Sequence, residues 1–261
     1  MRIIVLIILV NSILLNGISC QVKEAPVTPS PFLLDKSTLS GVGLQKIDLK
    51  NEPEKIFHQK RLVRGDELSV YVVSTQSWVN KIEDYSFDEY IYMLHGESVT
   101  RPEHGTGQTF YTGQHFFAPK GYTGEWEIKA GDNLHYELSV ISTHRKKATN
   151  KNVQDYKLLA PSVLSGVDIT FDESGNFNQT LVTGEELTIT LYAETPQLKN
   201  ITEPYKESLL YIQSGQLTLT SNTGEALTYY TGDFVFIPKG YTGSWLSEGL
   251  SMLKYLTITA S

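Results

Sequence analysis

The sequence is poor in the features that would indicate a disulfide framework or a nucleic-acid-binding surface. It contains one cysteine, Cys20, so a disulfide within the chain is excluded. Its 22 Lys and Arg residues are outnumbered by 29 Asp and Glu residues, which gives a net charge of −7, and the basic residues do not cluster. Nucleic-acid-binding proteins carry basic patches. We therefore expect no nucleic-acid partner.

Strongly apolar runs are scarce, and the longest one lies at the N-terminus. Residues 3–15 are almost wholly apolar and follow Met1 and Arg2. A membrane-spanning helix needs about 20 such residues, so this run is too short. Small residues follow it up to Cys20, as they do before the cleavage site of an export signal. The pattern predicts a signal peptide over residues 1–20.

The residues around Cys20 resemble the signal of bacterial lipoproteins. Ile18 and Ser19 fit that signal, whereas Gly17 stands where leucine is usual. The resemblance implies lipid attachment to Cys20 and a membrane anchor at the bacterial cell envelope, in the periplasm or on the outer surface; secretion without a lipid is the alternative. Residues 21–36 contain three prolines and little apolar periodicity, which predicts a flexible tether.

The body of the sequence contains an internal repeat. Residues 111–126 and 230–245 are identical at 11 of 16 positions, with an offset of 119 residues. The same offset, without a gap, also aligns Gly65 with Gly184, Tyr92 with Tyr211, Gly96 with Gly215, Gly105 with Gly224 and Tyr136 with Tyr255. Solenoid and propeller repeats are shorter, roughly 20–50 residues. Each copy is therefore expected to be a domain with its own core.

Each copy alternates short apolar and polar runs with Gly and Pro between them, which predicts β-strands. We expect strands over 68–73, 90–94, 114–118 and 134–140, and over 187–192, 209–212, 233–237 and 253–258. Gly96 and Gly215 are expected in tight turns between strands. The pattern predicts an all-β protein of two tandem jelly-roll barrels, residues 37–145 and 157–261, joined by a linker at 146–156.

The repeated motifs resemble those of the cupin superfamily. Gly113-x5-Pro119-x-Gly121 and its copy from Gly232 resemble the second cupin motif, and Glu89-x6-Gly96 resembles the end of the first. The segment Pro-Lys-Gly-Tyr-Thr-Gly-x-Trp is similar to that of cupins related to ureidoglycine aminohydrolases. The resemblance implies a bicupin, that is, two cupin barrels of the double-stranded β-helix type.

The resemblance also implies where a metal would be held, and the ligands are missing there. Metal-binding cupins use two histidines and a glutamate from the first motif and a histidine from the second. The last histidine position is Gly124 in the first copy and Gly243 in the second, and Glu89 of the first copy becomes Ser208 in the second. We therefore predict no metal and no other cofactor. A nonstandard site of Glu89, a histidine and Asp84 or Glu83 is the alternative.

The histidines give little support to that alternative. All six lie in the first copy or near its linker: His58, His95, His104, His115, His135 and His144. His95 and His104 precede turn glycines and are expected at the surface. His115 and His135 align with Phe234 and Lys254 at the 119-residue offset. Residues replaceable in this way are expected to pack rather than to bind metal.

Aromatic residues are the other candidates for a site. Strand alternation places Trp126 and Trp245 inside their barrels if Gly124 and Gly243 face inward. These indoles either fill the barrels or form walls that stack on a sugar ring or a planar ureide. In the second case Tyr92 and Tyr122, with Tyr211 and Tyr241, would offer hydroxyls to a ligand.

Two functions remain open from the sequence. The first is an exported, metal-free bicupin that binds a small polar molecule, sugar-like or ureide-like, or an envelope partner. The second is a hydrolase or isomerase similar to ureidoglycine aminohydrolases, acting in the first barrel with Glu89 as a candidate general base. The predicted ligand-binding residues are Glu89, Tyr92, Tyr122, Trp126 and Trp245. The sequence leaves the oligomeric state open.

Overall fold

The computed structural model describes residues 29–49, 54–145, 155–165, 169–249 and 252–261. The expected signal peptide, Cys20 and the first part of the expected tether lie outside these residues. The described residues form almost only β-strands, which confirms the predicted all-β class. Within them, no helix is long and apolar enough to cross a membrane.

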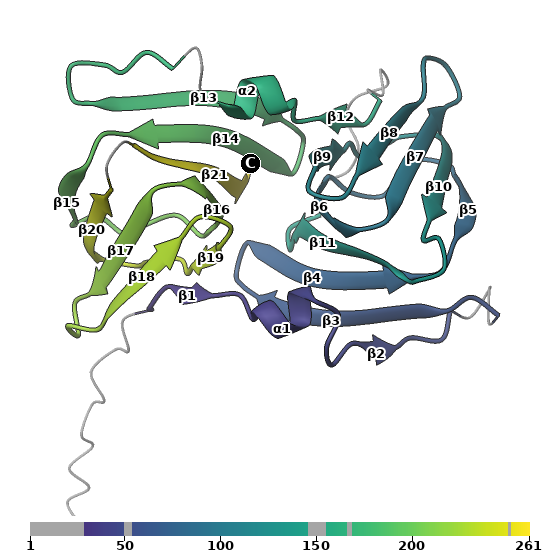
Figure 1. Ribbon diagram of the computed structural model, residues 1–261, viewed down its shortest axis with the longest axis horizontal. Helices are drawn as coiled ribbons and strands as arrows, with labels where there is room; N and C mark the ends of the chain where they lie inside the picture. Colours follow the sequence, from purple (N-terminus) through teal and green to yellow (C-terminus); the bar gives the residue numbers. More distant parts are fainter. Residues whose placement is uncertain (1–28, 50–53, 146–154, 166–168, 250–251) are drawn as a thin grey trace, which may run out of the picture.

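The strands form two barrels that lie side by side (Figure 1). In barrel 1, a seven-stranded sheet of order β12-β9-β6-β11-β4-β3-β2 and a four-stranded sheet of order β5-β10-β7-β8 enclose the interior. The strands are β2 (Gln45–Lys46), β3 (Phe57–Arg64), β4 (Leu68–Thr75), β5 (Trp78–Ile82), β6 (Glu89–His95), β7 (Glu97–Pro102), β8 (Gln108–Tyr111), β9 (His115–Ala118), β10 (Gly124–Lys129), β11 (His135–Ser142) and β12 (Lys157–Leu158).

Barrel 2 repeats this plan. Its six-stranded sheet has the order β1-β19-β16-β21-β14-β13, and its four-stranded sheet has the order β15-β20-β17-β18. The strands are β1 (Phe32–Leu33), β13 (Asn176–Thr183), β14 (Leu187–Glu194), β15 (Gln197–Ile201), β16 (Ser208–Ser214), β17 (Gln216–Ser221), β18 (Ala226–Tyr230), β19 (Phe234–Ile237), β20 (Gly243–Glu248) and β21 (Leu253–Ala260). The predicted core strands of both copies are all present.

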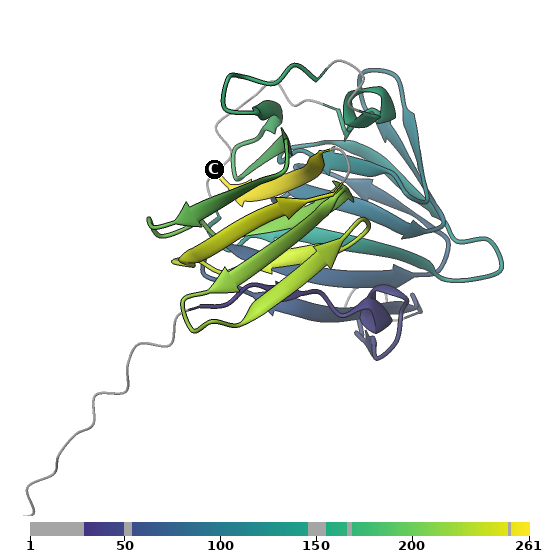
Figure 2. The same ribbon diagram turned by 60° about the vertical axis from the view of Figure 1, so that its left-hand side comes forward.

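One short edge strand of each barrel comes from the segment that leads into the other barrel. β1 comes before barrel 1 in the chain but pairs with β19 of barrel 2, and β12 comes before barrel 2 but pairs with β9 of barrel 1. Figure 2 shows β1 running along barrel 2 before the chain enters α1 (Lys36–Leu39). A second short helix, α2 (Pro161–Ser165), follows β12. β1 lies in the segment expected to be a flexible tether, and β12 lies at the start of the expected second domain. Both strands instead connect the two barrels.

Three apolar clusters follow from strand alternation. One fills barrel 1 beside the cavity described below, one fills barrel 2, and the largest lies between the barrels and is supplied by both. On β4, for example, Val70 and Val72 pack in the cluster between the barrels, while Tyr71 and Val73 face the cavity of barrel 1. The seven- and six-stranded sheets are thus covered on both faces near their centres, and the central strands β4, β11, β14 and β21 carry no exposed residue.

The register of the last strand corrects the gapless alignment of the two copies. Glu137 of β11 pairs with Met93, and Tyr255 of β21 pairs with Ile212, which is the equivalent of Met93. The offset is therefore 118 in this strand, and Glu137 rather than Tyr136 corresponds to Tyr255. Because a one-residue slip moves a strand residue to the opposite face, Tyr136 and Tyr255 do not play the same part. His135 likewise corresponds to Leu253, not to Lys254.

Candidate functional site

Barrel 1 contains a cavity of about 330 Å³ between its two sheets. Three of its polar residues, His135, Glu137 and Ser139, alternate along β11 and so share the inner face of that strand. Glu89, the first residue of β6, and Asn80 of β5 also line it. We call this space the barrel-1 cavity.

Glu89 lies at the centre of the polar part of this cavity and is 5% exposed. The hydroxyl of Ser139 donates to its Oε1, and the hydroxyl of Tyr85 donates to its Oε2. Burial, followed by the nearby charge of Glu137, raises the pKa of Glu89 to about 7. The two hydroxyl hydrogen bonds act in the opposite direction, as does the charge of Arg145. Glu89 can therefore take up or release a proton near neutral pH.

Glu137 is the second buried carboxyl group of the cavity. Its Oε2 lies 2.7 Å from Nε2 of His135, which is fully buried. A carboxylate only accepts hydrogen bonds, so Nε2 donates to it. Nδ1 of His135 has no hydrogen-bond partner among the described residues. The interior of barrel 1 thus holds two carboxyl groups and an imidazole within one space.

Aromatic side chains form much of the rest of the wall. Phe57, Trp78, Tyr85, Phe87 and Trp126 all line the cavity. The ring of Trp126 lies edge-on to Tyr85, with 6.2 Å between the ring centroids. The walls therefore present flat apolar faces above a polar floor, the composition usual for sites that bind small molecules.

Tyr92 and Tyr122 were predicted to offer hydroxyls to a ligand beside Trp126, but neither lines the cavity. Tyr92 points out of barrel 1 into the cluster between the barrels, and its ring centroid is 5.5 Å from that of Tyr211. Neighbours on a strand point to opposite faces, and Tyr92 is three residues from Glu89 on β6, which accounts for the difference. Tyr122 is 1% exposed, donates to the Glu125 carbonyl at 3.2 Å and is not among the residues that line the cavity.

Barrel 2 has filled the corresponding space with side chains. The rings of Tyr192 and Tyr255 stack with centroids 5.3 Å apart, and Trp245 lies against Tyr255 at the same centroid distance. Trp245 Nε1 donates to the buried Glu194 at 2.6 Å. Tyr192 and Tyr255 occupy the positions of Val73 and Glu137 in barrel 1. Trp245 is thus a packing residue, whereas Trp126 faces an open cavity.

The histidines divide between the two environments. His115 packs between the barrels against Tyr92 and Tyr211, and its Nδ1 is 2.7 Å from the Tyr90 hydroxyl oxygen. Burial lowers the pKa of His115 to about 3, so the ring is neutral. His135 was expected to pack in the same way but instead lines the barrel-1 cavity. The gapless alignment matched His135 with Lys254 and so gave no indication that His135 faces the cavity.

The residues present do not fit the metal that the motif resemblance implies. A Cβ atom on Gly124 would lie 2.3 Å from the Arg101 carbonyl oxygen, and one on Gly243 would lie 2.1 Å from the Thr220 carbonyl oxygen. A histidine at either position would collide with the neighbouring strand. In the part of the chain that the structure describes, no group of three or more His, Cys, Asp or Glu residues could hold a metal ion. Glu83 and Asp84 do not line the cavity.

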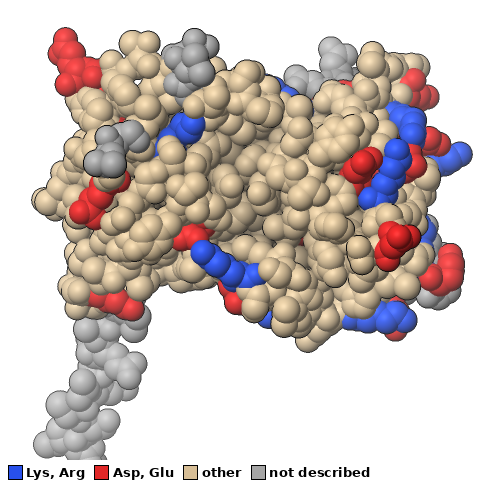
Figure 3. Space-filling view, in the orientation of Figure 1, with Lys and Arg blue, Asp and Glu red and all other residues tan. Residues whose placement is uncertain are grey.

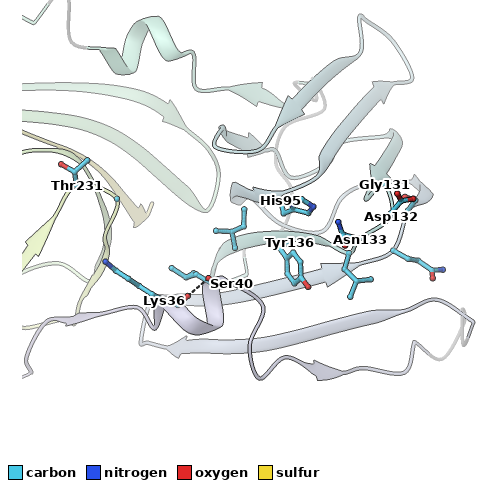
Figure 4. Close-up of a pocket in the computed structure, with 14 residues that line it drawn as sticks. Lys36, Ser40, His95, Gly131, Asp132, Asn133, Tyr136 and Thr231 are labelled. Carbon is cyan, nitrogen blue, oxygen red and sulfur yellow. Dashed lines mark hydrogen bonds between the residues drawn. The ribbon is translucent and has the colours of Figure 1, made fainter.

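A larger and more open groove lies at the surface where the barrels meet (Figure 4). Its volume is about 1250 Å³, and residues of α1, the turn before β11 and barrel 2 line it. His95 and Tyr136 point into it, and the Lys36 ammonium at its edge lies 2.6 Å from Asp233. The groove lacks the buried carboxyl pair of the barrel-1 cavity, which is therefore the stronger candidate site.

Part of this site could have been found from the sequence. His135, Glu137 and Ser139 occupy alternate positions of a strand that was correctly predicted, so one of its faces is polar. In a strand flanked by apolar residues, a polar face that is not at the surface signals a lined cavity. Tyr85 carried no such signal, because it lies in the connection between β5 and β6.

Comparisons with known proteins agree with the architecture. The family model described as the EutQ-like cupin domain matches residues 76–136 and 196–248. A protein of unknown function of the DUF861 family from Pseudomonas syringae pv. tomato is 17% identical, with a TM-score of 0.63, over 88% of this chain and 100% of that chain. A cupin 2 conserved barrel domain protein from Leptotrichia buccalis is 13% identical, with a TM-score of 0.57, over 90% and 97%.

Salicylate 1,2-dioxygenase from Pseudoaminobacter salicylatoxidans is also similar, with 10% identity and a TM-score of 0.61 over 90% of this chain and 84% of that chain. No curated protein sequence matches at a significant level. Identities this low carry the fold and not the activity. The function has to be argued from the cavity itself.

Proposed function

Because the chain is a cupin-fold protein with two cupin domains, we propose that its first barrel binds a small polar molecule and that its second barrel is a structural partner. The single observation that supports this is the contrast between equivalent interiors. Barrel 1 keeps a cavity with two buried carboxyl groups, Glu89 and Glu137, whereas barrel 2 fills the same space with Tyr192, Tyr255 and Trp245.

The contrast matters because buried carboxyl groups reduce stability. Removing an ionised carboxylate from water costs several kcal/mol unless it is paired or hydrogen-bonded. The pKa of Glu89 remains raised although two hydroxyls donate to it, so these hydrogen bonds offset only part of the cost. Barrel 2 shows that this fold is built with Ser208 and Tyr255 in place of Glu89 and Glu137. Retention of both carboxyl groups in barrel 1 therefore favours use over packing. Flat walls such as Trp126 suit a planar or ring-shaped ligand, such as a sugar-like or ureide-like molecule.

A thermal-shift screen of small polar molecules with the Glu89→Gln variant tests this proposal. The substitution preserves shape and removes the charge, so ligands that stabilise the wild type should stabilise the variant much less. Ser208→Ala, the equivalent position in barrel 2, is the control and should leave ligand responses unchanged. If Glu89→Gln keeps every ligand response and only raises the melting temperature, the cavity is not the binding site.

Catalysis in the same cavity is the second candidate, and the pKa of Glu89 is the observation that favours it. A carboxyl group with a pKa of about 7 is suited to general base or acid chemistry at neutral pH. The substrate would be a ureide-like compound, as in ureidoglycine aminohydrolases. Turnover of such compounds by the wild type but not by Glu89→Gln would support a hydrolase or isomerase.

We further propose that the protein is exported and attached to the bacterial envelope through a lipid on Cys20. An envelope protein is then a second possible partner. On the face shown in Figure 3, acidic and basic side chains lie next to one another over barrel 1 rather than in a basic patch. We therefore retain the prediction that nucleic acid is not a partner.

A further inference from the structure

Barrel 2 contains a lysine that is paired with a buried carboxylate. Lys199 of β15 directs its ammonium group to the buried carboxylate of Glu194 and to Asn176 Oδ1, the latter at 2.7 Å. The other carboxylate oxygen of Glu194 accepts the Trp245 indole N–H at 2.6 Å. The buried Glu194 carboxylate of barrel 2 is therefore bonded both to an indole and to an ammonium group whose side chain is about one third exposed.

Barrel 1 lacks this cation, and Thr75 and Phe57 stand where Glu194 and Asn176 bind it in barrel 2, so its own carboxyl groups come from other positions. Asn80 corresponds to Lys199, because Asn80 pairs with Trp126 as Lys199 pairs with Trp245. Asn80 lines the barrel-1 cavity with Glu89 and Glu137. The lining contains no lysine, and its one arginine, Arg61, is exposed and stacks on Tyr71 at 5.3 Å. Lys55 is not part of the lining, but its ammonium lies 3.9 Å from the centroid of the Trp78 ring. The cavity therefore combines two carboxyl groups and Trp126 without an ammonium group in its lining.

An unpartnered hydroxyl also points to a missing group. Thr75 of β4 lines the cavity, is 3% exposed and has no hydrogen-bond partner for its Oγ1 among the described residues. Thr75 pairs with His135, as Glu194 pairs with Leu253, so it stands where Glu194 binds Lys199 in barrel 2. Buried hydroxyls are normally hydrogen-bonded, so a bound molecule is the natural partner of Thr75.

We propose that the barrel-1 cavity binds an organic cation, a primary amine or a guanidinium, whose charged group pairs with Glu89 and Glu137. This deepens the proposed function and rests on it. Positive charge is favoured because Glu89 and Glu137 share a water-poor space, where opposite charges attract far more strongly than in water. The Trp126 indole, which also lines the cavity, adds to the attraction, since aromatic rings bind cations over their faces.

A lysine placed in the cavity tests the inference without any ligand. Asn80→Lys introduces the residue that barrel 2 has at this position, and because Asn80 lines the same cavity as Glu89 and Glu137, its ammonium should reach these carboxyl groups. We expect a melting temperature several degrees above the wild type, because the new cation offsets the burial of two carboxyl groups. Val79→Lys is the matched control, since Val79 is the next residue of β5 and is 51% exposed. It should leave the melting temperature nearly unchanged. A lower melting temperature for Asn80→Lys than for Val79→Lys overturns the inference.

Binding of two isosteric probes provides the second measurement. Methylguanidinium and N-methylurea have nearly the same shape and differ in charge. At pH 8, where Glu89 is ionised, calorimetry should show methylguanidinium binding about tenfold more tightly or better, a difference of about 1.4 kcal/mol. The preference should be lost in Glu89→Gln and in Asn80→Lys. Equal or tighter binding of N-methylurea, or binding of neither probe, contradicts the inference.

Failure of this inference can be told apart from failure of the proposed function. If N-methylurea or a methyl glucoside binds, and Glu89→Gln weakens that binding, the cavity is a ligand site for neutral molecules. The proposed function then stands and the cation inference is wrong. If no compound of the thermal-shift screen depends on Glu89, both fail.

Discussion

Asp88 in barrel 1 and Glu207 in barrel 2 occupy equivalent positions and make the same contact in opposite directions across the interface between the barrels. Oδ2 of Asp88 accepts the backbone N–H of Glu186 in barrel 2 at 2.7 Å. Oε1 of Glu207 accepts the backbone N–H of Leu68 in barrel 1 at 2.7 Å. Each carboxylate accepts a further backbone N–H of the same turn. Charge-assisted bonds of this kind are among the stronger hydrogen bonds in proteins.

The repeated glycines and lysines of the sequence belong to this interface. A Cβ atom on Gly184 would lie 2.2 Å from Asp88 Oδ2, and one on Gly65 would lie 2.2 Å from Glu207 Oε1. The two lysines of the repeated Pro-Lys-Gly segment bind acidic residues of the opposite barrel. Lys120 Nζ is 2.5 Å from Glu186, and Lys239 Nζ is 2.8 Å from Glu67. Much of the repeat is therefore explained by docking of the barrels rather than by a ligand.

The first prediction is that Asp88→Asn and Glu207→Gln destabilise the protein to a similar extent. Each replaces a carboxylate that accepts several backbone N–H groups with an amide that has one accepting oxygen. We expect each to lower the free energy of unfolding by about 1–3 kcal/mol, measured by urea denaturation. Lys46→Gln is the control, because its ion pair with Asp48 is exposed. Wild-type stability in both interface variants would show that the carboxylates do not hold the barrels together.

The second prediction concerns the pH dependence of stability. The pKa of Glu89 is about 7 in the folded protein, compared with an ordinary value of 4.5. Between these values the folded state keeps a proton that the unfolded state has lost, so this group reduces stability as pH rises from about 4.5 to about 7. The effect is about 1.4 kcal/mol for each unit of pKa shift. The stability gained by Glu89→Gln should therefore be larger at pH 8 than at pH 5.

Urea denaturation of the wild type and of Glu89→Gln at both pH values checks this prediction. The groups that influence the charge of Glu89 are Glu137 and Ser139 of β11, Tyr85, and Arg145. Ser208→Ala should show no such dependence on pH. A stability difference for Glu89→Gln that is the same at pH 5 and pH 8 would mean that Glu89 titrates at its ordinary value.

The third prediction is that the purified protein contains much less than one equivalent of transition metal after growth in metal-replete medium. The backbone of the neighbouring strand leaves no room for a side chain at Gly124 or Gly243, so the resemblance-implied ligand set cannot be completed. Elemental analysis of the protein after a chelator wash checks it. Stoichiometric Mn, Fe, Ni or Zn would contradict it.

The fourth prediction is that Cys20 carries the anchor. Cys20→Ser should move the protein from the membrane fraction to the soluble or secreted fraction and abolish incorporation of labelled palmitate. Lipid anchoring depends on burial of the acyl chains in the membrane. Without them we expect the acidic protein to dissociate from the membrane. An unchanged distribution would favour secretion without a lipid.

Four core strands of each barrel could be predicted from the sequence because their alternating pattern occurs twice in the chain. Alternation within 68–73 and 187–192, for example, predicts β4 and β14 correctly, and both strands extend only a little further. The exchange of β1 and β12 between barrels was not predictable. Both are strands of two residues, and a two-residue pairing leaves no periodicity to detect.

Only part of the candidate site could be predicted from the sequence. Glu89 and Trp126 were found, but their partners Glu137 and His135 were concealed by an alignment that is wrong by one residue in the last strand. A slip of one residue exchanges the two faces of a strand, so it turned a cavity residue into a packing residue. Tyr92 was predicted to offer a hydroxyl to the ligand, but it is three residues from Glu89 on β6 and so points to the opposite face. In the structure the pair Tyr92 and Tyr211 joins the barrels.

The last prediction follows from the position of Asp88 between two residues that line the cavity, Phe87 and Glu89. The contact of Asp88 with barrel 2 fixes the segment that presents both side chains, so barrel 2 should support the site as well as the fold. Glu207 has the same contact, but its neighbour Ser208 faces the filled interior of barrel 2. In a double-mutant cycle, Asp88→Asn and Glu89→Gln should couple by about 0.5 kcal/mol or more, whereas Glu207→Gln and Ser208→Ala should be additive. Coupling of equal size in both pairs would show only that neighbouring residues interact.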